Sequence, residues 1–304
     1  MSKSRYLYAI VLIVVLILTV ALLSNVRDRT TSQKLNIVVT FYPLAEFAKQ
    51  VGGDKVEVIN ITSGGVEPHD YEPSSQDIIK IQKSDLFLIN GNGLDTWALD
   101  LITDSKTRAV VMSEEVLAVD PSILEDPTLT NDPHFWLDPI IAQEIVDIIG
   151  DELSAVDPAN EELYQSNASN YRSSLDALDT NYTNGLRNCE KNKIVVSHKA
   201  FNYIGRRYNI EINNISGISP EEEPSAKQLA EISELVKTEG IEFVFSESLG
   251  SPELAQTVAT EVGVQMLELN PIEGLTKEQE ENNEDYVSIM RQNLINLRTA
   301  MKCQ

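Results

Sequence analysis

The sequence predicts an α/β protein of two lobes, each built on a parallel sheet flanked by helices, with one long helix joining them. Two patterns carry this prediction. Short β-branched runs alternate with amphipathic stretches in both halves of the chain, and the nearly thirty residues after Pro158 contain no further Pro and no β-branched cluster. The length of 304 residues also indicates about two domains, because single cores stop growing beyond roughly 250 to 300 residues.

The first half reads as a βαβ series. The run Ile37-Val38-Val39 is continuously apolar, which indicates a strand buried on both faces and therefore a mainly parallel sheet covered by helices. Asp138-Pro139 is a helix start. The elements expected before it are strands at 35–41, 56–61 and 85–90 and helices at 43–51 and 75–83.

A long helix is expected between the halves. Asp157-Pro158 is a typical helix start, since Pro is tolerated in the first turn, where its missing N–H costs nothing. Continued to Leu186 at 1.5 Å per residue, this helix would be about 40 Å long and act as a rigid rod between the lobes.

The second half repeats the alternation of the first. Expected strands lie at 194–197, 242–246 and 265–269, and expected helices at 200–208, 226–238 and 252–262. The predicted organisation is an N-terminal segment and tether at 1–33, a first lobe at 34–156, a linker helix at 157–190 and a second lobe at 191–304.

The N-terminal segment predicts export. Lys3 and Arg5 precede the uninterrupted apolar run Tyr6–Leu23, whose 18 residues would span about 27 Å as a helix, close to the thickness of a bilayer core. An uncleaved membrane anchor is favoured over a cleaved signal, because no small-x-small cleavage pattern stands out, and no Cys follows that could carry a lipid. Either way, the body is expected outside the cytoplasm, behind a polar tether at 26–34.

Composition excludes some partners. With 42% hydrophobic and 23% charged residues, the chain is an ordinary globular protein, so its function must come from specific sites. A net charge of −23 argues against nucleic acid, which is bound by Lys and Arg. The acidity fits cation ligands only weakly, and a well-solvated surface is the more ordinary interpretation.

Cys189 and Cys303 are the two cysteines, and a disulfide between them is plausible in an exported protein. Closing so long a loop would stabilise the fold by roughly 4 to 5 kcal/mol in the chain-entropy model. Neither has the close Cys-x-x-Cys spacing of thiolate zinc sites.

The three histidines of the chain each lie in a short polar or proline-marked motif: VEPHD at 66–70, NDPHFW at 131–136 and VVSHK at 195–199. His69, His134 and His198 are 65 and 64 residues apart, so only a tertiary fold could bring them together. Convergence of this kind is what a bound metal ion requires.

The candidate ligands fall in loops after predicted strands, where α/β sheets usually bind ligands. His198 directly follows the strand at 194–197, and His69 follows the strand at 56–61 across Gly64-Gly65. His134 lies in an acidic loop before a helix, and Glu273 follows the strand at 265–269. All four can face one cleft, which makes His69, His134, His198 and Glu273 the candidate ligands of a metal site.

Five stretches together resemble the metal-binding subunits of ABC importers for zinc or manganese, the cluster A-I solute-binding proteins. They are VTFYPL at 39–44, PHDYEPS at 68–74, LINGNGLDTW at 88–97, DPHFWLDP at 132–139 and SHKAF at 197–201. The resemblance covers nearly everything from Lys34 onward. It implies about four parallel strands in each lobe, a backbone helix between the lobes, a metal in the interlobe cleft and a membrane permease as partner.

Within that family, manganese-type members have a carboxylate at the position of His198, so the resemblance implies zinc. The usual fourth ligand is an aspartate at the position of Asn270; an amide oxygen binds zinc poorly, and Glu273 resembles the glutamate that completes the site in zinc-specific members. Three imidazoles and one carboxylate suit borderline-soft Zn²⁺ better than oxygen-preferring Mn²⁺, while Cu²⁺ and Ni²⁺ remain open. Glu67, Asp70 and Asp138 are the candidates for orienting the imidazoles.

The expected function is capture of Zn²⁺ outside the cytoplasm and its delivery to a permease by a monomer with no catalytic residues. A modest lobe movement is expected, since a long helix resists bending. The alternatives are a manganese- or iron-binding homologue, a cell-surface adhesin, and a zinc hydrolase, which would need an open fourth position on the metal. The His-rich loop of many relatives is replaced here by the short acidic segment 113–131.

Overall fold

The computed structural model describes residues 34–62, 64–102, 107–129 and 131–304, of which Leu35–Gln304 form one compact unit. The predicted apolar segment Tyr6–Leu23 lies outside these residues. Within them, no helix is long and apolar enough to cross a bilayer.

The first sheet contains four parallel strands in the order β2-β1-β3-β4. The two central strands are the apolar ones: β3 and the last three residues of β1 are fully buried, as expected for strands covered on both faces. The strands are β1 (Leu35–Val39), β2 (Val56–Asn60), β3 (Leu86–Ile89) and β4 (Arg108–Val111).

The helices around this sheet begin where the sequence provides caps. Ser74 and Asp77 form a capping box at the start of α3, and the Asp138 side chain caps α6, whose first residue is Pro139, as predicted. The helices are α2 (Tyr42–Gly52), α3 (Ser75–Gln82), α4 (Thr96–Ile102), α5 (Met112–Val119) and α6 (Pro139–Val156). Short 3₁₀ turns lie at Gly53–Lys55 (η1), Pro68–Asp70 (η2), Pro121–Glu125 (η3) and Phe135–Leu137 (η4).

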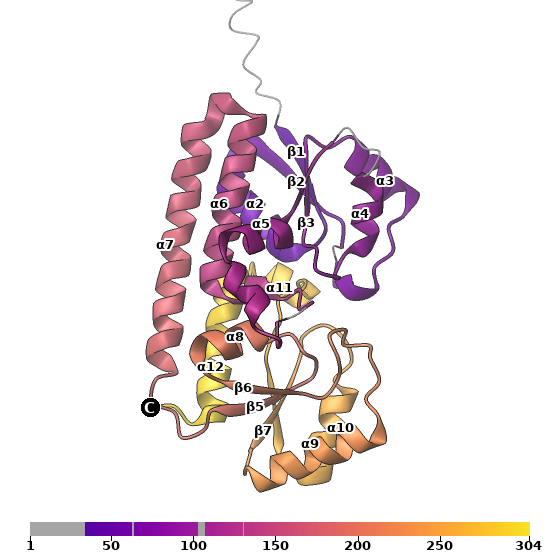
Figure 1. Cartoon of the computed structure of the whole chain (residues 1–304), viewed down its shortest axis with the longest axis vertical. Coiled ribbons are helices and arrows are strands. Elements are labelled where there is room, and N and C mark those ends of the chain that lie inside the picture. The colour runs from indigo at the N-terminus through magenta and orange to yellow at the C-terminus, as the bar shows by residue number, and fades with distance from the viewer. Residues whose placement is uncertain (1–33, 63, 103–106, 130) are drawn as a thin grey trace, which may run out of the picture. The chain divides into compact units, whose positions relative to one another are not determined.

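The predicted long helix is α7 (Glu161–Gly185), which runs beside α6 and ends near α12 (Figure 1). It starts later than predicted. Pro158–Asn160 forms a 3₁₀ turn (η5) instead, since the Asp157 carboxylate accepts from Asn160 Nδ2 and Tyr164 Oη and caps no backbone N–H. Its 25 residues give a length of about 37 Å.

The second sheet has the same connectivity as the first, with four parallel strands in the order β6-β5-β7-β8. The strands are β5 (Lys193–Val196), β6 (Glu211–Asn214), β7 (Phe243–Ser246) and β8 (Gln265–Glu268). The helices are α8 (Asn202–Tyr208), α9 (Ala226–Thr238), α10 (Glu253–Val262), α11 (Lys277–Glu281) and α12 (Tyr286–Met301). Two four-stranded parallel sheets flanked by helices confirm the predicted fold class.

Cys189 and Cys303 are joined by a disulfide, as the sequence suggested. The two residues also form an isolated antiparallel bridge, so the strand pairing and the covalent bond act at the same place. The end of α7 is thereby tied to the end of α12.

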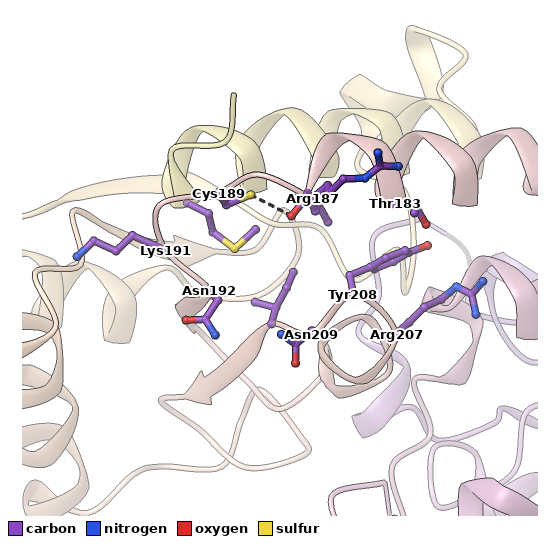
Figure 2. A pocket seen from close by; sticks show the side chains of 11 residues that line it. Thr183, Arg187, Cys189, Lys191, Asn192, Arg207, Tyr208 and Asn209 are labelled. Carbon is purple, nitrogen blue, oxygen red and sulfur yellow. Dashed lines mark hydrogen bonds between the residues drawn. The ribbon is translucent and has the colours of Figure 1, made fainter.

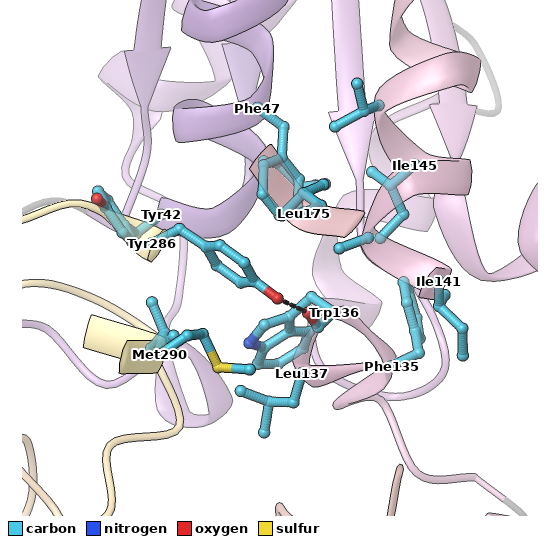
Figure 3. Packing of buried hydrophobic residues seen from close by; sticks show 14 of the residues in the cluster. Tyr42, Phe47, Phe135, Trp136, Leu137, Ile141, Ile145, Leu175, Tyr286 and Met290 are labelled. Atoms are coloured by element: carbon cyan, nitrogen blue, oxygen red, sulfur yellow. Dashed lines mark hydrogen bonds between the residues drawn. The ribbon is translucent and has the colours of Figure 1, made fainter. Parts of the chain in front are cut away.

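One hydrophobic core extends through both halves of the unit (Figure 3). Phe47 of α2 packs edge-on against Tyr286 of α12, and Trp136 of η4 against Phe41, with ring centroids 5.0 and 4.6 Å apart. The Tyr286 hydroxyl donates to the carbonyl of Trp136 at 2.6 Å. Buried aromatic contacts therefore hold the second half of the unit against the first, in addition to the covalent chain.

Candidate metal centre

The four residues predicted as ligands meet in the structure. One ligand atom from each of His69, His134, His198 and Glu273 lies within 4.8 Å of all the others. In the described part of the chain, this is the one group of three or more His, Cys, Asp or Glu side chains so placed.

Each residue reaches the cluster from a loop or a short helical turn. His69 is the middle residue of η2, and His134 directly precedes η4. His198 comes two residues after the end of β5, and Glu273 five residues after the end of β8. Loops at the carboxyl ends of parallel strands converge in this way because the strands point to the same edge.

The spacing of the ligand atoms fits a tetrahedral ion. Oε1 of Glu273 lies 3.0 Å from Nε2 of His134, 3.3 Å from that of His69 and 3.4 Å from that of His198. Nε2 of His134 lies 3.3 and 3.2 Å from the same atoms of His69 and His198. Zinc–ligand bonds of about 2.0 to 2.1 Å imply a separation of about 3.3 Å between neighbouring tetrahedral ligands.

The cluster is buried, and its electrostatics favour a positive charge at its centre. Burial alone would raise the pKa of Glu273, but the charge of His198 and hydrogen bonds from all three histidines hold it well below its usual value. Burial works against the charged form of His198, yet the charges of Glu247 and Glu273 raise its pKa well above the usual value. The pKa of His134 is raised in the same sense, mainly by hydrogen bonds to Asp132 and Glu273 that outweigh its burial. A proton or a metal cation can supply that charge.

Two carboxylates orient the imidazoles. Nδ1 of His134 lies 2.8 Å from Oδ1 of Asp132, and Nδ1 of His198 lies 2.7 Å from Oε1 of Glu247. A proton on Nδ1 that is donated to a carboxylate leaves the lone pair of Nε2 free to face the centre of the cluster.

Neither of these carboxylates was predicted from the sequence. Asp132 stands two residues before His134, and that proximity was a usable signal. Glu247 directly follows β7, at the same sheet edge as His198, but 49 residues separate the two in sequence. Only the pairing of β5 with β7 brings them together.

Glu67, Asp70 and Asp138 were predicted to orient the imidazoles, and this prediction was wrong. Asp138 caps α6 by accepting from Ile140 N at 2.9 Å, and forms an ion pair with Arg207 at 3.3 Å. Asp70 is exposed. Glu67 accepts a long 3.4 Å hydrogen bond from the backbone N–H of His69 rather than from its ring, and burial together with the charge of Glu273 raises its pKa to about 9.

The side chain of Asn270, the other residue considered as the fourth ligand, hydrogen-bonds to the backbone. Its Oδ1 accepts from the N–H of Ile272 at 2.7 Å. The carboxylate of Glu273 occupies the fourth corner of the cluster instead.

A separate cavity of about 390 Å³ lies beside the disulfide, between the end of α7, the start of β5 and the end of α8 (Figure 2). Its cationic lining residues are Arg187, Lys191 and Arg207, and Arg207 is already paired with Asp179 at 2.7 Å. None of its lining residues belongs to the histidine cluster. The candidate site is therefore the cluster and not this cavity.

Comparison with known proteins gives a consistent picture. The profile of the ZnuA family, described as "Zinc-uptake complex component A periplasmic", matches residues 37–300. The zinc-binding lipoprotein AdcA of Streptococcus pneumoniae is 38% identical over 280 residues, which cover 88% of this chain. The chain spans 56% of the length of that relative.

Two solved structures share the fold. The Zn(II)-bound ZnuA-like domain of S. pneumoniae AdcA has a TM-score of 0.76 and 39% identity, over 88% of this chain and 99% of that domain. The laminin-binding protein Lmb of Streptococcus agalactiae, described as bifunctional with adhesin and metal-transporting activity, has a TM-score of 0.76 and 32% identity, over 88% of this chain and 99% of its own.

Proposed function

Because this chain belongs to the ZnuA family of zinc-uptake components, we propose that it captures Zn²⁺ outside the cytoplasm and delivers it to the permease of an ABC importer. The observation that carries the proposal is the convergence of three Nε2 atoms and one carboxylate oxygen within 4.8 Å of one another, from four separate loops. The zinc-bound AdcA domain with the same fold supports the choice of metal.

We propose His69, His134, His198 and Glu273 as the four ligands. Three neutral imidazoles and one carboxylate make a tetrahedral N₃O set, which suits Zn²⁺ better than Mn²⁺. Asp132 and Glu247 would fix the ring orientations of His134 and His198, and their negative charges would offset that of the ion.

Four protein ligands leave no open position on the metal for an activated water, so we propose transport rather than catalysis. In the same family, AdcA is described as a zinc-binding lipoprotein, which agrees with this choice. No residue of the chain is assigned a catalytic role.

The test is metal content and affinity of the soluble body, residues 34–304, purified without added metal. Elemental analysis should find close to one zinc per chain, and competition with a chromophoric chelator should show high affinity. His198→Ala and Glu273→Gln should each lower that affinity by at least about a hundredfold, because each removes one of four ligands. Glu253→Gln, an exposed glutamate of α10, is the matched control. The proposal would be refuted if residues 34–304 bound no zinc, or if the ligand variants had the same zinc affinity as the control.

Adhesion is a second candidate function, favoured by the fold shared with Lmb. The test is binding of the chain to immobilised laminin, with the triple variant His69→Ala, His134→Ala, His198→Ala beside the parent. Adhesion that persists in the triple variant would establish a second surface, independent of the metal centre.

We propose that the body is held at the outer face of the membrane by the apolar segment Tyr6–Leu23. AdcA is described as a lipoprotein, but both cysteines of this sequence are engaged in the disulfide, so a lipid on Cys is not available here. Cell fractionation tests this. The full chain should sediment with membranes, and residues 34–304 exported behind a cleavable signal should not.

We also propose the division into a first lobe at 34–156, a linker helix at 157–190 and a second lobe at 191–304. Two observations support it: the sheets are separate, and α7 lies between them along the chain. Limited proteolysis that cuts first inside either sheet, rather than in the loops around these boundaries, would contradict it.

A further inference from the structure

The segment that carries Glu273 has an unusual backbone. Ile272, the residue before it, has a φ of +60°, in the left-handed region that β-branched residues rarely adopt. Its side chain is fully buried. A conformation of this kind persists only when the surrounding structure holds it in place.

Buried hydrogen bonds from two other elements hold it. Asn293 of α12 accepts from the N–H of Asn270 at 2.9 Å and donates to the carbonyl of the same residue at 2.7 Å. The indole N–H of Trp136 donates to the carbonyl of Pro271 at 2.8 Å. Together with the bond from Ile272 N to the Asn270 side chain, these contacts fix the three residues that precede Glu273.

The contacts also tie two ligands together. Trp136 lies two residues after His134, and Tyr286 of α12 holds its carbonyl (Figure 3). Trp136, Asn270 and Asn293 are at most 2% exposed, so bulk water does not compete for these hydrogen bonds. The distance between the backbone of Glu273 and His134 is therefore set by Trp136 and Asn293.

Apart from the three histidines, no described side chain hydrogen-bonds the carboxylate of Glu273 itself. Oε1 of Glu273 faces the three Nε2 atoms, while Oε2 is buried and has no hydrogen-bond partner among the described residues. The position of the backbone thus decides whether one oxygen or both can reach an ion at the centre. One oxygen gives four-coordination, and two give a higher coordination number, richer in oxygen, which harder ions such as Mn²⁺ prefer.

We infer that Asn293 and Trp136 are positioning residues that keep Glu273 a one-oxygen ligand, and so make the centre select Zn²⁺ against cations that need more oxygen ligands. The inference rests on the proposed function and adds a cause of its selectivity that lies outside the ligand set. Releasing either contact should let the carboxylate approach the ion with both oxygens.

Two variants and two matched controls test this. Trp136→Phe removes the donor and keeps a buried ring, and Asn293→Ala removes both bonds to Asn270. Asn296→Ala removes a similar bond from the same helix to the carbonyl of Glu268. Trp97→Phe removes an indole N–H that has no acceptor in the described structure.

The first readout is the visible spectrum of each protein loaded with Co²⁺, whose absorption is strong when it is tetrahedral and weak at higher coordination numbers. The second is the Zn²⁺/Mn²⁺ affinity ratio, measured by competition. In Trp136→Phe and Asn293→Ala the absorption should weaken and the ratio should fall at least tenfold, whereas both controls should match the parent.

A folded Trp136→Phe or Asn293→Ala with the parent spectrum and the parent ratio would overturn the inference, and either variant suffices if the other does not fold. Loss of affinity for both metals in equal proportion, with an unchanged spectrum, would also overturn it, because that result indicates a merely structural role. Failure of the proposed function looks different, since the parent itself would then bind neither Zn²⁺ nor Co²⁺.

Discussion

Replacing Glu247 by Gln is expected to weaken zinc binding and to flatten its dependence on pH. The Glu247 side chain is 5% exposed, and its Oε1 lies 2.7 Å from Nδ1 of His198. Gln keeps an oxygen that can accept from Nδ1 but removes the negative charge that faces the ion through the ring. Loss of such an outer carboxylate typically lowers metal affinity 10- to 100-fold, or about 1.4 to 2.7 kcal/mol.

The sign of the pH effect follows from His198. Burial opposes its charged form, but Glu247 and Glu273 raise its pKa well above the usual value, so in the metal-free protein a proton competes with zinc at neutral pH. The affinity of the parent should therefore keep rising with pH above about 6.5. Without the charge of Glu247 the pKa of His198 falls, and the competition ends at a lower pH.

The assay is chelator competition at several pH values between 5.5 and 8.5, with Glu253→Gln as the control for loss of one glutamate charge. The difference between Glu247→Gln and the parent should be largest at high pH and should shrink as the pH falls. A variant whose curve runs parallel to that of the parent, or coincides with it, would refute the reasoning about Glu247.

Three further predictions concern the whole fold. Burial, followed by the charges of neighbouring aspartates, raises the pKa of Glu144 to about 7, so ionisation of this side chain lowers the stability of the fold as the pH rises from about 4.5 to 7. Glu144→Gln should therefore stabilise the protein by about 1 kcal/mol at pH 8, after allowance for solvent screening, and by nothing at pH 4. Thermal unfolding at both pH values measures this. A Cβ on Gly91 would lie 2.2 Å from the Ser113 hydroxyl, whereas one on Gly250 would meet nothing within 4 Å, and both have positive φ. Gly91→Ala should therefore cost about 2 to 4 kcal/mol and Gly250→Ala about 1 kcal/mol in urea unfolding, and equal losses would contradict the packing argument. Zinc should change the radius of gyration, about 18 Å for a body of this size, by less than about 5 per cent in solution scattering, because the shared core resists separation of the lobes; a large compaction would contradict this.

The sequence predicted best the parts whose burial is visible in a single segment. Central strands such as β1 and β3 are continuous apolar runs, and Asp138-Pro139 indicates the start of α6. The edge strands β4 and β6 were missed because Glu211–Asn214 has no apolar run, and Arg108–Val111 has only a short one in which a single residue is buried. Their strand state depends on pairing with a neighbour.

The helix α12 was missed for a related reason. Tyr286–Met301 mixes apolar residues with asparagines of low helix propensity, and it is stabilised by burying one face against the core. Its functional residue, Asn293, could not have been singled out, because its partner Asn270 is 23 residues away.

The candidate ligands stood out because the chain has so few histidines, each in its own motif. What surrounds them depends on tertiary contacts, so Glu247 and Trp136 could not be identified from the sequence. The left-handed φ of Ile272 was equally hidden, because its sequence suggests an extended residue and only the folded environment imposes the turn.

The disulfide makes residues 189–303 a covalently closed ring that contains the whole second sheet, His198 and Glu273. A protease that cuts an exposed stretch inside the ring, such as Glu221–Glu223, would leave both fragments attached to the rest of the protein. The nick would be visible on a denaturing gel only after reduction. The disulfide thus allows the protein to be cut once in this stretch and still keep all four candidate ligands on one molecule.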